Sequence, residues 1–461
     1  MESLQPLFHP ASVAVVGASD DAAKHGHRLL KNLVAGGYEG RIYPVNPNAQ
    51  TVLGFKSYAS LSAIAERVDL AVIVIPASMV LDSVRDAIDA RVRALVVITA
   101  GFGETGESGR QLQAEIAGLC TQARTPMVGP NCMGICNFPA KLTAVFNDLK
   151  SAPGAVSFVS QSGTYGVTTL NFGVKMGIDF NTFVSSGNEA VTQFTDFLEY
   201  LGEDPNSHVI MGYIESLRDG ERFARVAREV TRRKPVVVMK FGRTRKGSIA
   251  AASHTGALTG THAVYSSVFR QCGVIEVTRT HDLLNVALAL SLQPPMRSNR
   301  VAIIGASGGF AVAATDYLEE HGIEVPTFSD ELQQQIRREA DTRAYASLQN
   351  PIDLAADFRS APLLKCVEIA LKQDCIDGAI AALPASPFPP LEETIRGLER
   401  MQTESGKPLV ICYYARPEGV EAIQAMTRVL PAYRTPEEVG EVMARLHQYG
   451  AYLGRTRASQ P

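Results

Sequence analysis

The 461-residue chain has no apolar run that approaches the ~20 residues needed to span a membrane as a helix. Its first residues, Met1 to Pro6, also lack the positive charge and the apolar stretch of a signal peptide. Hydrophobic residues make up 46% of the chain and charged residues 20%, which is typical of a well-packed protein without extensive disorder. We therefore expect a cytoplasmic enzyme or binding protein.

An excess of charge of one sign is lacking as well, and so is a regular arrangement of cysteines. The formal net charge is -3 and there is no dense run of lysine and arginine, so we expect no nucleic-acid-binding surface.

The seven cysteines are scattered. The nearest pair, Cys132 and Cys136, has no second pair with a histidine that would complete a zinc site. We predict reduced thiols and no bound metal.

The sequence also lacks the glycine-rich fingerprint of dinucleotide-binding domains. Where G-x-G-x-x-G is needed, Gly17-Ala18-Ser19-Asp20 supplies a single glycine. Asn46 ends the next strand in place of the acidic residue that binds the ribose. Both absences argue against NAD. They leave open a phosphate-bearing ligand that is held by Lys24 and by the helix start after Gly17.

The first 130 residues contain a regular alternation of short apolar runs and amphipathic segments. This alternation predicts a parallel α/β sheet with crossover helices, in which a ligand binds at the carboxyl ends of the strands. Small and polar residues collect at four of these ends. The candidate binding residues are Gly17, Ala18, Ser19, Lys24, Val45, Asn46, Pro47, Ile75, Pro76, Ala77, Thr99, Ala100 and Gly101.

A second α/β unit follows and offers a candidate phosphate site. The apolar strand Val156 to Val159 leads into Ser160-Gln161-Ser162-Gly163-Thr164, directly before a helical pattern. Free backbone N–H groups, two hydroxyls and the positive end of the helix dipole would all face an anion there. Ordinary helix capping by serine or threonine explains the same residues without a ligand.

A third unit follows a predicted linker, Gln293 to Asn299. It opens with Val301-Ala302-Ile303-Ile304-Gly305-Ala306-Ser307, which echoes the segment Val13 to Ser19 and predicts another strand, loop and helix of a doubly wound fold. Because this unit has few candidate catalytic groups, we expect it to support the protein or to form an interface. We place the three domains at residues 1–130, 131–293 and 299–461.

One histidine stands in an unusual setting. His254 lies among small residues in Ser253-His254-Thr255-Gly256. The preceding segment, Phe241 to Ser248, has two glycines and three cations and follows the apolar run Val236 to Met239. We predict that a strand leaves the core here and enters a mobile, anion-binding loop. A satisfied structural histidine in an ordinary loop is the alternative.

Eight short motifs follow one another along nearly the whole chain. They are Gly17-Ala18-Ser19, Tyr43-Pro44-Val45-Asn46-Pro47, Ala100-Gly101-Phe102, Gly129-Pro130-Asn131-Cys132-Met133-Gly134, Ser160-Gln161-Ser162-Gly163, Ser186-Gly187-Asn188, Tyr213-Ile214-Glu215 and Ser253-His254-Thr255-Gly256. In this order they resemble the ADP-forming acyl-CoA synthetases, the acetate–CoA ligase branch of the succinyl-CoA synthetase superfamily. The resemblance implies a Rossmann-like CoA-binding domain followed by two flavodoxin-like, doubly wound domains.

The resemblance also implies roles for individual residues. His254 would be transiently phosphorylated, and Glu215, just past the strand Val209 to Ile214, would hold its imidazole. Without the resemblance, Glu215 would be taken for a surface carboxylate at a strand end. CoA would be the ligand of the strand ends in the first domain. The residues expected around the phosphate and the acyl carbonyl are Gly129, Pro130, Asn131, Ser160, Gln161, Ser162, Gly163, Thr164, Gly187 and Asn188.

Members of this family need an ATP-grasp module, and the three predicted domains leave no segment for one. The resemblance therefore implies an α subunit, with ATP, ADP and Mg²⁺ bound by a separate ATP-grasp β subunit in an α2β2 hetero-oligomer. The expected reaction reversibly couples a carboxylate, CoA and ATP to acyl-CoA, ADP and phosphate. Two alternatives are a non-catalytic CoA-binding regulatory protein, in which the loss of His254 would be expected, and a nicotinamide oxidoreductase, which the missing glycines oppose.

Overall fold

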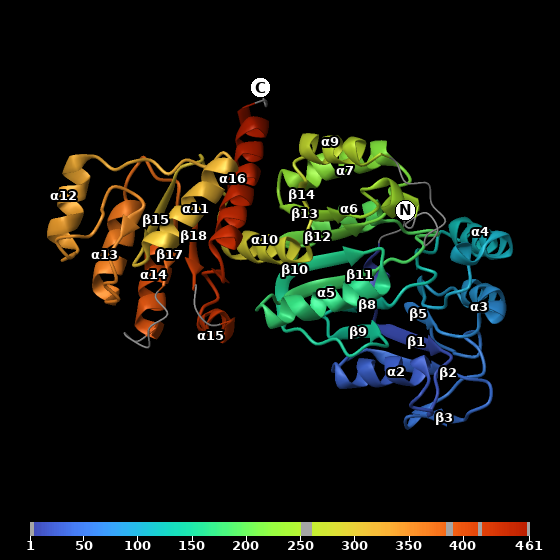
Figure 1. Ribbon diagram of the computed structural model, residues 1–461. Coiled ribbons are helices and arrows are strands. Elements are labelled where there is room, and N and C mark those ends of the chain that lie inside the picture. The colour runs from blue at the N-terminus through green and yellow to red at the C-terminus, as the bar shows by residue number, and fades with distance from the viewer. Residues whose placement is uncertain (1–3, 250–260, 384–390, 414–416, 459–461) are drawn as a thin grey trace. The chain divides into compact units, whose positions relative to one another are not determined.

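The computed structural model describes residues 4–249, 261–383, 391–413 and 417–458. Three sheets of five or more strands account for most of the strands (Figure 1), and the chain divides into two compact units. Unit 1 comprises residues 1–174 and 178–276, and unit 2 comprises residues 175–177 and 277–461. The predicted α/β class with parallel sheets is confirmed. The boundaries given above for three domains stay a prediction.

The first sheet of unit 1 is parallel, in the order β2-β1-β5-β6-β7. Its strands are β1 (Ser12–Val16), β2 (Arg41–Val45), β5 (Leu70–Ile73), β6 (Ala94–Val97) and β7 (Met127–Val128). From β1 the chain passes to β2 on one side and then returns to β5 on the other. This reversal opens a crevice at the carboxyl ends of β1 and β5, where ligands of doubly wound folds bind.

Helices cover both faces of this sheet, which is why all residues of β1, β5 and β6 are buried. Helix α2 (His25–Ala35) packs Leu29 and Leu33 into the core that contains Val13. On the opposite face, α3 (Ala77–Asp89) and α4 (Glu107–Gln122) pack around Ala14. The short elements are α1 (Gln5–Phe8), the 3-10 helix η1 (Gly103–Thr105) and the hairpin strands β3 (Thr51–Val52) and β4 (Phe55–Lys56).

The second sheet of unit 1 has the order β14-β13-β12-β10-β11-β8-β9. Its strands are β8 (Gly134–Asn137), β9 (Leu142–Val145), β10 (Pro153–Ser160), β11 (Phe180–Ser185), β12 (Val209–Ile214), β13 (Val236–Lys240) and β14 (Ile275–Val277). The helices of this part are α5 (Gly163–Lys175), α6 (Phe194–Glu203), α7 (Gly220–Thr231) and α9 (His262–Gln271). The antiparallel edge pair β8 and β9 was not predicted, because four consecutive buried residues carry no alternating pattern.

The loop predicted over Phe241 to Ser248 is partly wrong. Residues 241–244 are irregular, but residues 245–249 are helical. Thr244 explains the early helix start, because its Oγ1 accepts a hydrogen bond from the Gly247 N–H at 3.1 Å and its carbonyl accepts one from Ser248 at 2.7 Å. This is the geometry of a helix N-cap, and it outweighs the two glycines that favoured a loop.

Unit 2 contains the third sheet, which is parallel in the order β16-β15-β17-β18-β19. Its strands are β15 (Val301–Gly305), β16 (Ile352–Asp353), β17 (Gly378–Ala382), β18 (Leu409–Cys412) and β19 (Ala432–Tyr433). Its helices are α10 (Thr280–Leu292), α11 (Gly308–Glu320), α12 (Asp330–Glu339), α13 (Ser360–Leu371), α14 (Leu391–Ser405), α15 (Pro417–Met426) and α16 (Pro436–Ala458). The predicted strand, loop and helix after Val301 are confirmed.

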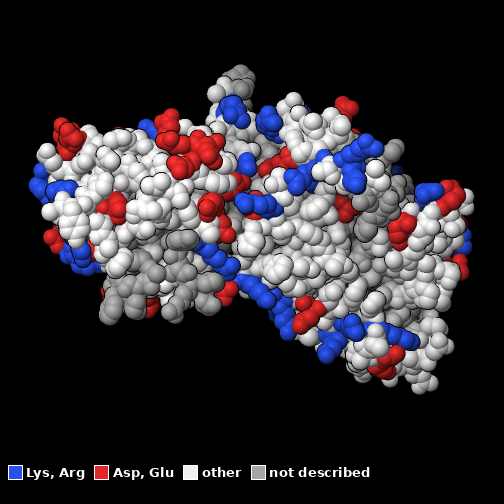
Figure 2. Space-filling model, viewed as in Figure 1, with Lys and Arg blue, Asp and Glu red and all other residues white. Residues whose placement is uncertain are grey.

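The face of the protein that is drawn in Figure 2 carries charges of both signs, and the cysteines, all within the described residues, form no disulfides. Figure 2 shows lysine and arginine side chains interspersed with acidic side chains on the face drawn. All seven cysteines, which lie within the described ranges, are unpaired, and six of them are buried. Burial raises the pKa of Cys120 and Cys132 to about 12, so these thiols stay protonated and weakly reactive. No helix in the described ranges is long and apolar enough to cross a membrane.

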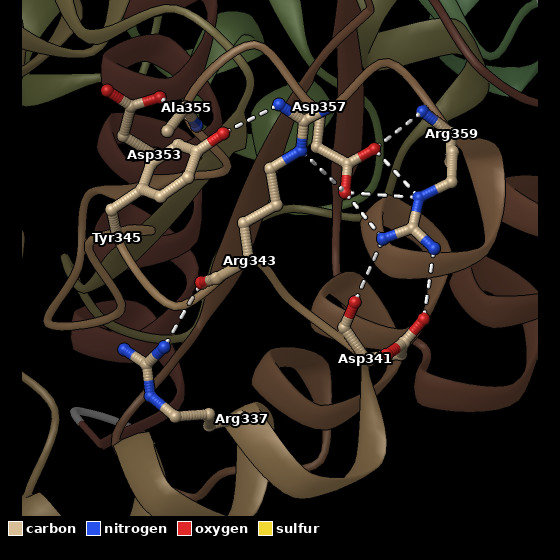
Figure 3. Close-up of polar contacts among 8 residues, drawn as sticks. All are labelled: Arg337, Asp341, Arg343, Tyr345, Asp353, Ala355, Asp357 and Arg359. Carbon is tan, nitrogen blue, oxygen red and sulfur yellow. Dashed lines mark hydrogen bonds and ion pairs between the residues drawn. The ribbon is translucent and has the colours of Figure 1, made fainter.

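The loop that follows β16 in unit 2 is held by a cluster of ion pairs (Figure 3). Asp357 is only 2% exposed, and its carboxylate accepts hydrogen bonds from the Arg359 guanidinium and forms a second ion pair with Arg343. Arg359 also contacts Asp341, which is exposed. The Arg359 guanidinium holds the pKa of Asp357 below its ordinary value. The cluster therefore stabilises a loop, residues 354–359, that forms no helix or strand.

We expect Asp357→Asn to lower the free energy of unfolding by about 1–3 kcal/mol at neutral pH, because two arginines lose a buried charged acceptor. Since folding lowers the pKa of Asp357, its contribution is present above the unfolded pKa of about 4 and is lost as pH falls through the lower folded value. Urea unfolding between pH 7 and pH 3 measures this. The matched variant Asp341→Asn, at an exposed partner of Arg359, should stay within about 0.5 kcal/mol of the unchanged protein; equal losses in both variants would contradict the assignment.

Candidate functional site

A cavity of about 1100 Å³ lies at the carboxyl ends of β1, β2, β5 and β6. Eleven of the thirteen residues predicted from these strand ends line it: Gly17, Ala18, Ser19, Lys24, Val45, Asn46, Pro47, Ile75, Pro76, Thr99 and Ala100. The other two, Ala77 and Gly101, do not line the cavity. Gly101 instead has a φ of 109° and donates its N–H to the Glu104 carboxylate at 2.6 Å. The four strand ends thus meet in one crevice.

The turn after β1 requires glycine at position 17, because of both its backbone conformation and its close neighbours. Gly17 has a φ of 95°, and a Cβ on it would lie 2.5 Å from the Val74 carbonyl oxygen. A Cβ on Gly26 would lie 2.0 Å from the Gly17 carbonyl oxygen, so α2 packs directly on this turn. The Asn46 Nδ2 donates to the Ala18 carbonyl at 2.8 Å. Asn46 therefore ties two loops of the crevice together, a role that an acidic residue at this position could not fill.

Further residues complete the cavity wall. His25 lines it from the start of α2, and Met79, Asp82 and Asp86 line it from successive turns of α3. Phe146, which follows β9, reaches the cavity from the second sheet and stacks on His25 with ring centroids 4.3 Å apart. Nothing in the sequence near Phe146 indicates this contact, because 121 positions separate the two rings along the chain. Only the packing of β9 against α2 brings them together.

A smaller cavity of about 120 Å³ lies at the N-terminus of α5. Seven of the ten residues predicted for the phosphate and acyl site line it: Asn131, Gln161, Ser162, Gly163, Thr164, Gly187 and Asn188. Cys132 and Met133 complete its wall. Asn131, Cys132 and Met133 line both this cavity and the large crevice, so the two adjoin. An anion here would face free backbone N–H groups at the start of a helix.

The three remaining predicted residues, Gly129, Pro130 and Ser160, do not line this cavity but position residues that do. Ser160 is fully buried, and its Oγ donates to the Ser162 carbonyl at 2.6 Å, so its hydroxyl is used within the turn. The Pro130 carbonyl accepts the Asn188 N–H at 2.9 Å after a cis Gly129-Pro130 bond. These contacts place Asn131, whose Nδ2 donates to the Asn188 side chain at 3.1 Å.

Glu215 is not a surface carboxylate. It follows β12, as predicted, and is only 4% exposed. Burial, followed by the neighbouring Glu215 charge, raises the pKa of the Tyr213 hydroxyl far above its ordinary value. Tyr213 also stacks on Phe241 at 4.3 Å and lies 4.6 Å from the Tyr165 ring of α5. An aromatic cluster therefore places Glu215 beside the loop that starts α5. His254, its predicted partner, lies outside the described residues.

A buried carboxylate, Glu189, lies next to the small cavity. Glu189 is 5% exposed, has a φ of 53°, and accepts a hydrogen bond from Ser186 Oγ at 2.7 Å. Burial raises its pKa to about 7. Its neighbour Asn188 donates to Glu104 at 2.6 Å and accepts, through its carbonyl, a bond from Arg218 at 2.9 Å. The loop with the Ser186-Gly187-Asn188 motif is thus rigidly tied to both sides of the site.

Comparison with known proteins agrees with this geometry. Residues 11–137 match the family described as a CoA binding domain, and residues 153–290 match the succinyl-CoA ligase like flavodoxin domain. Apart from Phe146, the residues that line the large crevice and the small cavity lie within these two matches, and so does Glu215. A solved structure of Ca. Korarchaeum cryptofilum dinucleotide forming acetyl-coenzyme A synthetase 1, in complex with phosphate and ADP, has a TM-score of 0.93 and 33% identity over 100% of both chains.

Curated relatives extend over the full chain. The alpha subunit of acetate–CoA ligase (ADP-forming) II from Pyrococcus furiosus is 34% identical over 98% of this chain and 99% of its own length. Acetate–CoA ligase (ADP-forming) I from Archaeoglobus fulgidus is 33% identical over 99% of this chain, which spans 65% of that longer protein. The chain therefore belongs to the ADP-forming acetate–CoA ligase family, in which it corresponds to the alpha subunit.

Proposed function

We propose that the large crevice holds CoA and that the adjoining small cavity is the place where phosphate, acyl group and thiol meet. The observation that carries this proposal is the shared wall of Asn131, Cys132 and Met133. A long ligand in the crevice can present its end to an anion at the start of α5. Two separate sites would not allow this, because the thiol must reach the acyl carbon directly.

The proposed cycle relays a phosphoryl group through His254. The imidazole nitrogen first takes the γ-phosphoryl group of ATP, and ADP leaves. A carboxylate oxygen of the acid substrate then attacks the phosphorus, the N–P bond breaks, and an acyl phosphate forms. The CoA thiolate attacks the acyl carbon, and inorganic phosphate leaves. Each step is reversible, and the relay joins two distant sites while it keeps water from the phosphoryl group.

Glu215 is proposed to accept a hydrogen bond from the other imidazole nitrogen. A neutral imidazole, with an ordinary pKa of ~6.5, can act as the nucleophile at neutral pH. A carboxylate on its second nitrogen selects the reactive tautomer and stabilises the cation that forms on phosphorylation. The burial of Glu215 favours this role, because a carboxylate that faces little water stabilises a neighbouring cation more strongly.

The nucleotide is proposed to bind elsewhere. The relatives named as alpha subunits imply a separate partner subunit. We propose that this partner is an ATP-grasp β subunit that binds ATP, ADP and Mg²⁺, that the assembly is α2β2, and that it works in the cytoplasm. The acid substrate is a small carboxylate, as in the acetate–CoA ligases that the chain resembles.

Reconstitution tests the proposed reaction. The purified chain, a purified ATP-grasp partner, Mg-ATP, CoA and acetate should together yield acetyl-CoA and ADP in equal amounts, and neither chain should do so alone. Product analysis by chromatography distinguishes ADP from AMP. Formation of AMP and pyrophosphate, or turnover by this chain without a partner, would contradict the proposal.

Lys24 is expected to hold a phosphate of CoA. Its side chain is exposed at the crevice wall, directly before α2. Lys24→Ala should weaken CoA binding by about ten- to 150-fold, because a charged hydrogen bond to phosphate contributes roughly 1.5–3 kcal/mol. Calorimetry on the full chain measures the dissociation constant. Lys31→Ala, an exposed lysine of the same helix that does not line the crevice, is the control and should bind CoA normally.

A further inference from the structure

The segment Glu215 to Leu217 leaves the sheet, yet side chains from three other elements hold its backbone. Gln161 Oε1 accepts the N–H of Glu215 at 2.6 Å and that of Ser216 at 3.0 Å. Gln161 Nε2 donates to the Ser216 carbonyl at 2.8 Å. The Tyr265 hydroxyl, on α9, accepts the Leu217 N–H at 3.2 Å. The Glu215 carbonyl accepts a hydrogen bond from Lys240 Nζ at 2.7 Å.

Lys240 is an exceptional residue of this protein. It ends β13 and is completely buried, whereas lysines are almost never fully buried. Its ammonium group donates to the carbonyls of Glu215 and Phe241 and lies 4.6 Å from the centre of the Tyr265 ring. Such burial is costly, so a role is expected for the charge. The proposed catalytic cycle does not use this charge.

We propose that Lys240, with Gln161 and Tyr265, is a positioning residue for Glu215: it fixes the backbone of the carboxylate that orients the phosphorylated histidine and places a positive charge behind it. This inference rests on the proposed role of Glu215. Gln161 also lines the small cavity, so the same contacts connect the anion site at α5 to Glu215.

The charge of Lys240 acts in a defined surrounding. Burial lowers the pKa of Lys240, while the negative charges of Glu215, after β12, and of Glu276, on β14, raise it. Tyr265 faces the ammonium group from α9. In return, a nearby cation favours the ionised form of a carboxylate. Removal of the Lys240 charge should therefore raise the pH at which Glu215 loses its proton.

Lys234, two residues before the start of β13, offers a matched control. Its Nζ also bridges two backbone carbonyls, those of Leu201 at 3.0 Å and Asp204 at 2.5 Å, and burial also lowers its pKa. It does not line either cavity. Lys234→Met and Lys240→Met thus remove the same kind of lysine clamp, but only Lys240→Met removes it from Glu215.

The experiment measures the rate and pH profile of phosphorylation of the full chain by Mg-ATP and the partner subunit. Lys240→Met should slow phosphorylation by about 10²-fold, the cost of a small misplacement near the reaction, and should shift the acid limb of the profile to higher pH. Its CoA affinity should not change. Lys234→Met should keep the rate and profile of the unchanged protein, even if both variants are less stable.

A second variant covers the case in which Lys240→Met does not fold. Tyr265→Phe keeps the ring and removes only the acceptor of the Leu217 N–H, so it should slow phosphorylation less than Lys240→Met without changing CoA affinity. Wild-type rates in the Lys240 variant, or in Tyr265→Phe when it is the variant available, overturn the inference. Glu215→Gln distinguishes a failure of the positioning role of Lys240 from a failure of the proposed role of Glu215. If it is slow and the Lys240 variant is normal, only the positioning role is wrong; if Glu215→Gln is itself normal, the proposed role of Glu215 fails.

Discussion

Replacement of His254 by alanine is expected to abolish phosphorylation of this chain. With Mg-ATP and the partner subunit, the unchanged protein should acquire a phosphate that is labile in acid and stable in base, the behaviour of a phosphorus–nitrogen bond. In the variant the nucleophile is absent, so no N–P bond can form. Radiolabelled phosphate followed by acid and base treatment distinguishes this product from a serine ester.

The reverse reaction gives a sharper form of the same test. Acyl-CoA and inorganic phosphate both bind this subunit in the proposed cycle, so they should label His254 without any nucleotide site. The comparison requires that the variant remain folded. Circular dichroism and CoA binding serve as controls. Label that persists in His254→Ala, or that falls only on Ser160 or Ser162, would show that another residue is the carrier.

Glu215→Gln is expected to slow phosphorylation by about 10²-fold or more while CoA affinity stays nearly unchanged. The amide has almost the same size as the carboxylate, but it cannot stabilise the imidazolium that forms when the histidine takes the phosphoryl group. The backbone contacts of Glu215 with Gln161 and Lys240 do not involve the side chain, so the segment should keep its position. Single-turnover labelling measures the rate, and calorimetry measures CoA binding.

A pH series adds a second readout to this variant. The acid limb that belongs to the Glu215 carboxyl should disappear in Glu215→Gln, because the amide does not titrate. In Glu189→Gln, by contrast, the Glu215 limb should remain, since Glu189 contacts Ser186 on the other side of the cavity. A wild-type labelling rate in Glu215→Gln would mean that the buried carboxylate serves only the fold.

Much of the site could be predicted because its residues stand at the ends of strongly patterned elements. Gly17, Pro47, Ile75 and Thr99 each follow an apolar run, and the carboxyl ends of parallel strands necessarily share one edge of a sheet. The segment Ser160 to Thr164 was located in the same way, from a strand that leads directly into a helix. The eight ordered motifs then indicated the family, which the full-length relatives confirm.

The incorrect and missed features all involve contacts between distant segments or local capping. The helix from residue 245 depends on one threonine cap, which two nearby glycines masked. The edge strands β8 and β9 have no alternation because both of their faces are buried. Phe146 enters the crevice because β9 packs on α2, which no local pattern records.

The sequence by itself determined the alternation of strands and helices in the parallel sheets, the four strand ends of the crevice and the position of Glu215 after β12. Each of these features depends on neighbours a few residues away. Only the tertiary structure decided that the crevice and the small cavity share a wall, that Glu215 is buried, and that Lys240 and Gln161 hold its backbone. Burial and hydrogen bonding at these places depend on segments 25 to more than 100 residues apart. Such contacts form only when whole helices and strands pack against one another. The energy of that packing comes from residues far apart in the sequence, so a short segment cannot indicate it.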